Sequence, residues 1–226
     1  RNGARRVRRM KRDDWRLLFL ATRDHHHASR TCHGAWRRAE EGDDPDALRR
    51  LAYPIAHGRT IWAVSREHDV DPMLVLGLMR QESKYQATAV SRVGARGAMQ
   101  IMPKTGHLIA DRIGDLAFTA ADLEDPEQAI GYGIRYLGLL LDRYDGVFPL
   151  AVASYNAGPF NVSSWLAGTG PHLPLDAFVE HIPFRETRDY VKRVTANYDT
   201  YTRLYGSEGV AVPPHPLGDQ AEVVDF

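Results

Sequence analysis

Apolar residues recur along this chain with a helical period, and the alternating pattern of a β-strand is scarce. Asp71 and Pro72 form an N-cap and first-turn pair that predicts the start of a helix. Residues 73–83 then carry apolar side chains on nearly every side, which is typical of a buried central helix. Further on, residues recur at alternating three- and four-residue steps and predict the packed face of a long helix: Val191, Val194, Tyr198, Tyr201 and Tyr205.

Proline and glycine divide the rest of the chain into further helices. Pro45, Pro103 and Pro126 each stand where a helix is expected to begin, because proline is well tolerated in the first turn. We expect two more helices, one at 55–68 and one that runs from Phe148 until Gly-Pro stops it at Gly158. The sequence therefore predicts a mostly α protein.

One stretch and one terminus do not follow the helical pattern. Residues 86–98 (QATAVSRVGARGA) are rich in small side chains and predict a loop or a short β-excursion. The proline-containing tail at 207–226 is expected to be unpacked. We therefore expect a compact helical domain at 53–206, preceded by helical material at 1–52.

Composition narrows the class of protein. With 226 residues, 43% of them hydrophobic and 26% charged, the chain is long enough to bury a core and matches the globular average. One cysteine, Cys32, excludes an intrachain disulfide. The longest apolar runs are as short as 137–141, so no transmembrane segment is expected. Because the chain begins at Arg1 and not at Met, we expect a fragment or processed form without its signal peptide.

The net charge is zero, but the charges are unevenly distributed. Residues 1–50 hold 14 basic and 8 acidic side chains, and Arg1–Arg12 alone holds seven cations and no anion. A nucleic-acid-binding arm is one interpretation, and a solvated helix face is the other. No aromatic residue lies among these cations to stack on a base, which favours the solvated face. We therefore expect no nucleic-acid partner.

Candidate metal and cofactor sites are weak. His25, His26 and His27 precede Cys32 and His33, but consecutive residues point to different sides of a helix and no CxxC or HxxxH spacing occurs. No glycine-rich nucleotide-binding motif and no G-x-S-x-G elbow is present. We expect no metal and no cofactor.

Glu82 is the most informative single residue. Leu78 lies four positions before it and Leu74 eight, so helical spacing places its carboxyl on an apolar face. Burial disfavours the charged form and raises a carboxyl pKa, which suits a general acid near neutral pH. The alternative is a structural glutamate at a helix end, bonded to Arg80 or to loop amides. The periodicity alone leaves both open.

The residues around Glu82 carry a resemblance to a known family. The stretch MRQESKYQATAVSRVGARGAMQIMPKTG at 79–106 resembles the signature of the family 23 lytic transglycosylases, of the soluble lytic murein type. Three further stretches match in order, at 151–166, 178–194 and 198–206, and LAYPIAHGR at 51–59 looks like the segment that joins an upstream superhelical domain to the catalytic one. One departure is visible: the usual Gly-Leu-Met-Gln reads Gly-Ala-Met-Gln, with Ala98 at the second position, which is expected to loosen packing near the groove.

The resemblance implies a fold and a reaction. The fold would be lysozyme-like, mostly α with minimal β structure, with 1–52 as the end of the helical superhelix. The substrate would be peptidoglycan, cut between N-acetylmuramic acid and N-acetylglucosamine. Members use one glutamate, which aligns with Glu82: it protonates the leaving oxygen and later takes the proton of the muramic C6 hydroxyl. The substrate's acetamido group stabilises the charged centre, and between Glu82 and Gly106 the chain has no other acidic residue.

The same resemblance supplies the remaining candidates. Ser83 either orients Glu82 or caps the helix, Gln100 matches a sugar-binding residue, and Tyr155 matches the tyrosine that positions the carboxylate. The other candidates would contact glycan, the local turn or the stem peptide: Met102, Asn156, Ser91 and Glu186. Asn156 is expected to serve its turn as much as the substrate, and Glu186 has an alternative role as a charge at a helix N-terminus.

Alternative functions remain open at this point. A lysozyme-type muramidase would cut the same bond with water, and a muropeptide-binding module would keep the fold without turnover. Peptidoglycan strands and stem peptides are the expected partners in every one of these cases, and the protein is expected to be a monomer. Since that polymer lies outside the cytoplasm, we expect a periplasmic or envelope location.

Overall fold

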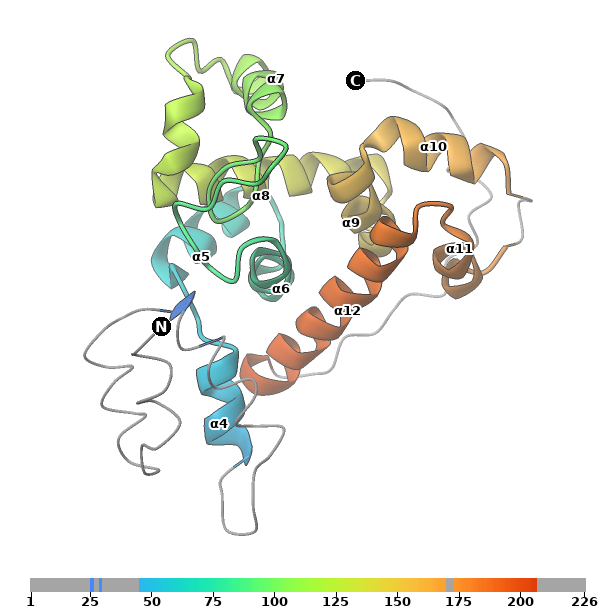
Figure 1. Ribbon diagram of the computed structural model, residues 1–226, viewed down its shortest axis with the longest axis horizontal. Helices are drawn as coiled ribbons and strands as arrows, with labels where there is room; N and C mark the ends of the chain where they lie inside the picture. The colour runs from blue at the N-terminus through green and yellow to red at the C-terminus, as the bar shows by residue number, and fades with distance from the viewer. Residues whose placement is uncertain (1–24, 27–28, 30–44, 170–172, 207–226) are drawn as a thin grey trace.

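The computed structural model describes residues 25–26, 29, 45–169 and 173–206 (Figure 1). Within them the chain is mostly helical, as the sequence predicts, and its β structure is limited to isolated bridges that join Arg96 to Val90 and to Ile101. The basic stretch Arg1–Arg12 and the tail at 207–226 lie outside the described residues.

Helices follow one another through short connections. In chain order they are α4 (Pro45–Ala52), α5 (Gly58–Glu67), α6 (Pro72–Glu82), α7 (Pro103–Ile113), the 3-10 helix η1 (Ala120–Glu124), α8 (Pro126–Arg143), α9 (Phe148–Ala157), α10 (Pro159–Ala167), α11 (Leu175–His181) and α12 (Arg185–Tyr205).

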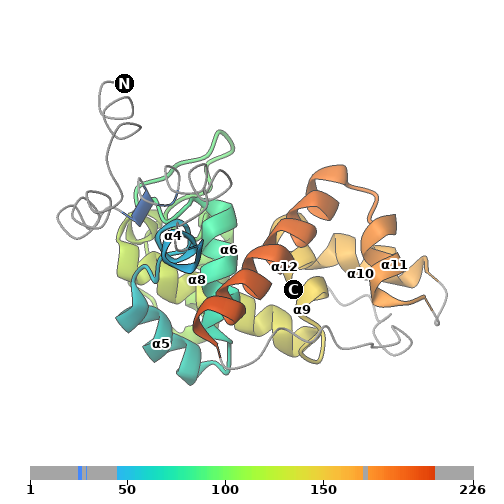
Figure 2. The ribbon, with the colours of Figure 1, turned by 90° about the horizontal axis from the view of Figure 1, so that it is seen from below.

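Helix α6 lies at the centre of the molecule, and the long helix α12 crosses it (Figures 1 and 2). Its residues 74–80 are buried, which confirms the predicted central helix. The two helices approach closely at Gly77, where a Cβ atom would lie 2.9 Å from the backbone nitrogen of Tyr198. The Asn197 side chain also donates a hydrogen bond of 3.1 Å to the Gly77 carbonyl, so α12 holds α6 in a fixed position.

Capping side chains set the helix starts that the sequence predicts. Asp71 accepts a hydrogen bond of 2.7 Å from the Met73 amide, and Asp125 caps α8 in the same way through the amides of Glu127 and Gln128. These carboxylates pair amides that a helix N-terminus leaves without intrahelical partners.

The elements at 159–181 were not predicted. Helix α9 does end before Gly158, but Pro159 begins α10 at once, because proline opens a helix as readily as it ends one. Helix α11 is only seven residues long and shows too few turns for a periodic signal.

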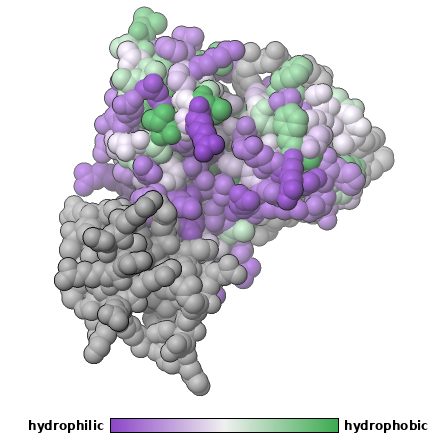
Figure 3. All heavy atoms as spheres, viewed as in Figure 1, coloured by the Kyte–Doolittle hydropathy of each residue, from purple (hydrophilic) through white to green (hydrophobic). Residues whose placement is uncertain are grey.

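On the face shown in Figure 3, the described residues are largely hydrophilic, with apolar residues scattered among them. Leu116, Val93 and Val90 are the most exposed large apolar side chains in the described part, at 96, 76 and 61%. In that part of the chain, none of the helices combines the length and apolar character that a membrane crossing requires.

Candidate active site

Glu82 is the last residue of α6, and its surroundings raise the pKa of its carboxyl. Burial raises the pKa of its carboxyl from 4.5 to about 7, and a hydrogen bond from Tyr190 opposes this rise. The carbonyl end of the helix adds partial negative charge that also disfavours a carboxylate. The raised pKa is the one that the apolar face of α6 predicts, and it lets Glu82 carry a proton near neutral pH.

Tyr190 provides the hydrogen bond to that carboxyl. Its hydroxyl donates to Glu82 Oε1 from the second turn of α12, and burial together with the nearby carboxylate raises the pKa of Tyr190 well above its usual value. The tyrosine therefore stays a neutral donor. The Arg80 guanidinium donates instead to the Ser29 hydroxyl and the Ala52 carbonyl.

Sequence reasoning missed Tyr190, although a signal existed. It lies four residues before Val194, on the packed side of the long helix. A buried tyrosine on such a face requires a partner for its hydroxyl. That requirement could have marked Tyr190 as a candidate.

The loop after α6 folds against the helix end. The Ser83 hydroxyl donates to the Ala98 carbonyl at 2.7 Å, so it fastens the loop to the end of α6. Gln100 has a left-handed backbone, with φ at 51°, and its side-chain amide donates to the carbonyls of Ala89 and Gly97 at 3.1 and 2.9 Å. Because both partners are acceptors, the amide nitrogen must face the loop, and the amide oxygen points to another side.

Two glycines let this loop lie close to its neighbours. Gly97 has φ at +75°, and a Cβ atom there would overlap the carbonyl oxygen of Leu123. On α8, a Cβ atom at Gly133 would lie 2.6 Å from the Cβ of Met99. The loop therefore sits against η1 and α8 with no room for a side chain at either position.

Tyr155 lies near the carboxyl but hydrogen-bonds elsewhere. Its hydroxyl donates to the Met99 carbonyl at 3.0 Å. Burial raises the pKa of Tyr155 well above its usual value, and the Glu82 carboxylate raises it further, so the two groups are close. In this structure the hydroxyl that reaches the carboxyl belongs to Tyr190, and a catalytic role for Tyr155 stays a prediction.

The two methionines of the signature occupy different environments. Met99 is fully buried in the core against Gly133. Met102, the N-cap residue of α7, is 39% exposed. Exposure leaves the Met102 thioether available to a ligand, whereas Met99 is a packing residue.

The remaining candidates lie further around the site. The Ser91 hydroxyl accepts a hydrogen bond of 2.9 Å from the Ala95 amide and closes the turn at the loop tip. Asn156 at the end of α9 accepts one of 2.7 Å from the Thr187 hydroxyl on α12. Glu186 is exposed in the first turn of α12, one helical turn before Tyr190. Their contacts with substrate stay predictions.

The described residues contain no group of three or more histidine, cysteine or acidic side chains that could hold a metal ion. Of the histidine and cysteine run considered above, His27, Cys32 and His33 lie outside the described part. His26 contacts the carbonyl of Lys84 through its Nδ1 atom at 3.1 Å.

The site is therefore a buried, protonatable glutamate at the end of the central helix, held by the hydroxyl of a tyrosine. The chain belongs to the transglycosylase SLT domain family, whose model matches residues 60–173. The soluble lytic murein transglycosylase of Salmonella typhimurium is 36% identical over 154 residues, which is 68% of this chain and 24% of that protein. The chain thus spans about a quarter of the length of this relative.

Solved structures agree on the fold. The lytic transglycosylase Slt of Pseudomonas aeruginosa, solved as an inactive glutamate-to-glutamine mutant, superposes with a TM-score of 0.72 at 30% identity. The match covers 93% of this chain and 32% of that one. The 70 kDa soluble lytic transglycosylase of Escherichia coli gives 0.74 at 26% identity, over 88% of this chain and 32% of that one.

Proposed function

We propose that this chain is a peptidoglycan lytic transglycosylase. It would cut the β-1,4 bond between N-acetylmuramic acid and N-acetylglucosamine without water and leave a 1,6-anhydromuramoyl end. Family membership supports the substrate class, and the environment of Glu82 supports the chemistry.

Glu82 would act twice in one turnover. As a protonated carboxyl, with a pKa of about 7, it gives its proton to the glycosidic oxygen as the bond to the muramic C1 atom breaks. The resulting carboxylate then takes the proton of the muramic C6 hydroxyl as that oxygen bonds to C1. The proton returns to Glu82 and no water is consumed. Tyr190 would hold the carboxyl in place and stabilise its charged form between the two steps.

One observation carries this proposal: among the described residues, no acidic neighbour acts on the pKa of the Glu82 carboxyl. The influences on its pKa are burial and the Tyr190 hydrogen bond, and within the described residues no second carboxylate is among them. Most glycosidases that use water or a covalent intermediate need two carboxylates that flank the bond. A lone carboxyl favours attack by a hydroxyl of the substrate itself.

Two other functions use the same fold. A muramidase would need a group to activate water, and among the described residues no second carboxylate acts on the pKa of Glu82. A muropeptide-binding module would not need an acid with a raised pKa. The envelope location, the monomeric state and the boundaries at 53 and 206 remain parts of this proposal.

The experiment compares the wild-type chain with Glu82→Gln on purified cell-wall sacculi. We expect the wild type to release soluble muropeptides, and the variant to bind sacculi equally well but release them about 10²–10⁴-fold more slowly. A wild type that binds without release would be a binding module. Release by the variant at the wild-type rate would assign the acid to another residue.

A further inference from the structure

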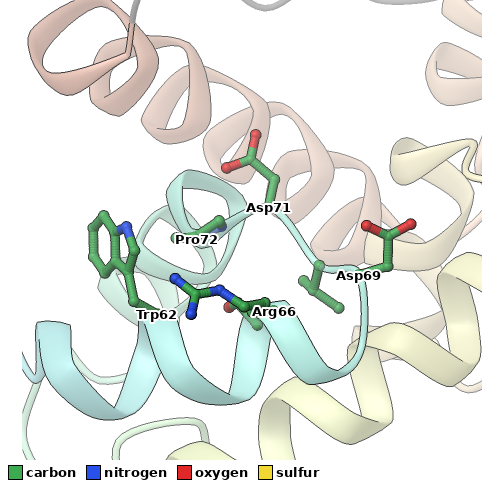
Figure 4. A pocket seen from close by; sticks show the side chains of 7 residues that line it. Trp62, Arg66, Asp69, Asp71 and Pro72 are labelled. Carbon is green, nitrogen blue, oxygen red and sulfur yellow. The ribbon is translucent and has the colours of Figure 1, made fainter.

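A cavity lies at the opposite end of α6 from Glu82. It occupies about 430 Å³ between α5 and the start of α6 (Figure 4). Since α6 has 11 residues at about 1.5 Å each, this cavity is roughly 16 Å along the helix from the candidate active site. It is lined by Trp62, Ser65, Arg66, Asp69, Val70, Asp71 and Pro72.

The sequence of α5 supplies one wall. Trp62, Ser65 and Arg66 are spaced three and four residues apart, so they share one face of the helix. The indole of Trp62 is only partly buried, and the guanidinium of Arg66 is exposed. Figure 4 shows both side chains on the cavity side of α5.

The loop into α6 supplies the opposite wall. Asp69 has a left-handed backbone, with φ at 51°, and its side chain is exposed. Asp71 is fixed, because its two oxygens accept hydrogen bonds from the Met73 amide at 2.7 Å and the Tyr198 hydroxyl at 2.6 Å. Each oxygen of a carboxylate has capacity for a further bond, so Asp71 presents preorganised acceptors.

Ser65 forms the floor of the cavity. The residue is 1% exposed, and its hydroxyl has no hydrogen-bond partner among the described residues. Because the Ser65 hydroxyl is itself shielded from solvent, the groups that a ligand can reach are the exposed side chains of the lining.

We propose that this cavity is a saccharide-binding site distinct from the cleavage site. The apolar C–H face of a pyranose ring packs on a partly exposed indole such as Trp62. Sugar hydroxyls both donate and accept, and they match a site that offers the carboxylates of Asp69 and Asp71 beside the guanidinium of Arg66. The volume is within the roughly 300–1,000 Å³ range of small-molecule sites.

Other ligand chemistries fit less well. Two carboxylates against one guanidinium disfavour an anion. A metal ion is disfavoured as well, because the described part of the chain contains no group of three or more histidine, cysteine or acidic side chains that could hold one. A mixed, nearly balanced set of donors and acceptors around an aromatic face fits a neutral polyhydroxylated ring.

The test uses Glu82→Gln, so that no substrate is cleaved, and follows ¹H–¹⁵N spectra during titration with chitotetraose and, separately, with maltotetraose. We expect saturable shifts of the Trp62 indole signal and of amides at 65–72. Shifts with chitotetraose alone would assign an N-acetylated glycan, and shifts with both sugars would assign pyranose rings in general. Saturable shifts also support the site if the proposed cleavage fails, because Glu82 takes no part in it.

Matched variants separate this site from the active site. In the Glu82→Gln background, Trp62→Ala, Arg66→Ala and Asp69→Asn should each weaken binding at the cavity about tenfold, which corresponds to the loss of one strong contact. Signals around Tyr190 should not change. Glu67→Gln and Arg59→Ala replace exposed residues of α5 that do not line the cavity, and they should have no effect.

Arg66 and Asp69 are exposed, so their variants keep the test valid if Trp62→Ala does not fold. The proposal is overturned if neither sugar shifts the Trp62 signal at millimolar concentration. It is also overturned if Arg66→Ala and Asp69→Asn weaken binding no more than the two controls do.

Discussion

The hydroxyl of Tyr190 donates a hydrogen bond to the carboxyl of Glu82, although 108 positions separate the two residues in the chain. The contact exists because α12 crosses α6, and the close approach at Gly77 fixes how the two helices lie. Burial raises the pKa of Glu82, and the Tyr190 bond limits that rise. The acid therefore depends on two helices from opposite ends of the domain.

Replacing Tyr190 with phenylalanine should raise the pKa of Glu82 above about 7, because the hydrogen bond stabilises the carboxylate. A hydrogen bond to a charged group contributes about 1.5–3 kcal/mol, which corresponds to a rise of roughly one to two pKa units. The pH dependence of turnover should shift upwards by that amount, and ¹³C NMR of the carboxyl measures the pKa directly. An unchanged titration would show that Tyr190 does not act on the acid.

Tyr155→Phe should behave differently from Tyr190→Phe. The lost hydroxyl leaves the buried Met99 carbonyl unpaired, so the free energy of unfolding should fall by about 1–3 kcal/mol. The pKa of Glu82 should change less than in Tyr190→Phe, because Tyr155 makes no hydrogen bond to it. Denaturant unfolding and the same ¹³C titration check both points. A large pKa change with unaltered stability would transfer the positioning role to Tyr155.

Glu82→Gln should change how stability depends on pH. A carboxyl whose pKa is raised from 4.5 to about 7 on folding holds its proton more tightly in the folded state, so the wild type loses stability as pH rises through that window. The glutamine variant has no such loss. The difference in free energy of unfolding, variant minus wild type, should therefore be larger at pH 8 than at pH 4 by up to about 3 kcal/mol. If the stability difference between the variant and the wild type is the same at pH 4 and pH 8, the carboxyl must lie in solvent.

The glycines of the loop provide a matched pair. Gly94 and Gly97 both have positive φ, but a Cβ at Gly94 meets nothing within 4 Å, whereas one at Gly97 overlaps Leu123. Gly94→Ala should lower the free energy of unfolding only by the backbone strain, about 1–2 kcal/mol. Gly97→Ala should cost about 1–3 kcal/mol more and should also slow turnover, because the loop must move away from η1. Equal losses in unfolding experiments would mean that the loop is not held there.

Much of the fold could be predicted because local rules decide it. Asp71 and Pro72 fix the start of α6 through one side chain and one ring, and the apolar run that follows can only be buried. The raised pKa of Glu82 also follows from spacing along one helix. Helix α11 could not be predicted, since seven residues contain too little periodicity.

Long-range pairing accounts for what the sequence did not reveal. Nothing local indicates that Tyr190 and not Tyr155 reaches Glu82, because the answer depends on how α12 and α9 are placed relative to α6. Ser83 illustrates the same limit. Its place as the C-cap residue of α6 is local and was expected, but the bond of its hydroxyl to the Ala98 carbonyl, 15 residues away across the loop, was not.

The most direct test of the central claim is the mass of the products released from purified sacculi. If Glu82 acts alone, the muramic C6 hydroxyl is the best-placed nucleophile, because attack within one ring has an effective concentration of up to ~10⁵ M or more. The account predicts 1,6-anhydromuramoyl ends, lighter than hydrolysed ends by the mass of one water and unreactive to borohydride. A digest dominated by reducible muramic acid would contradict it and identify a muramidase.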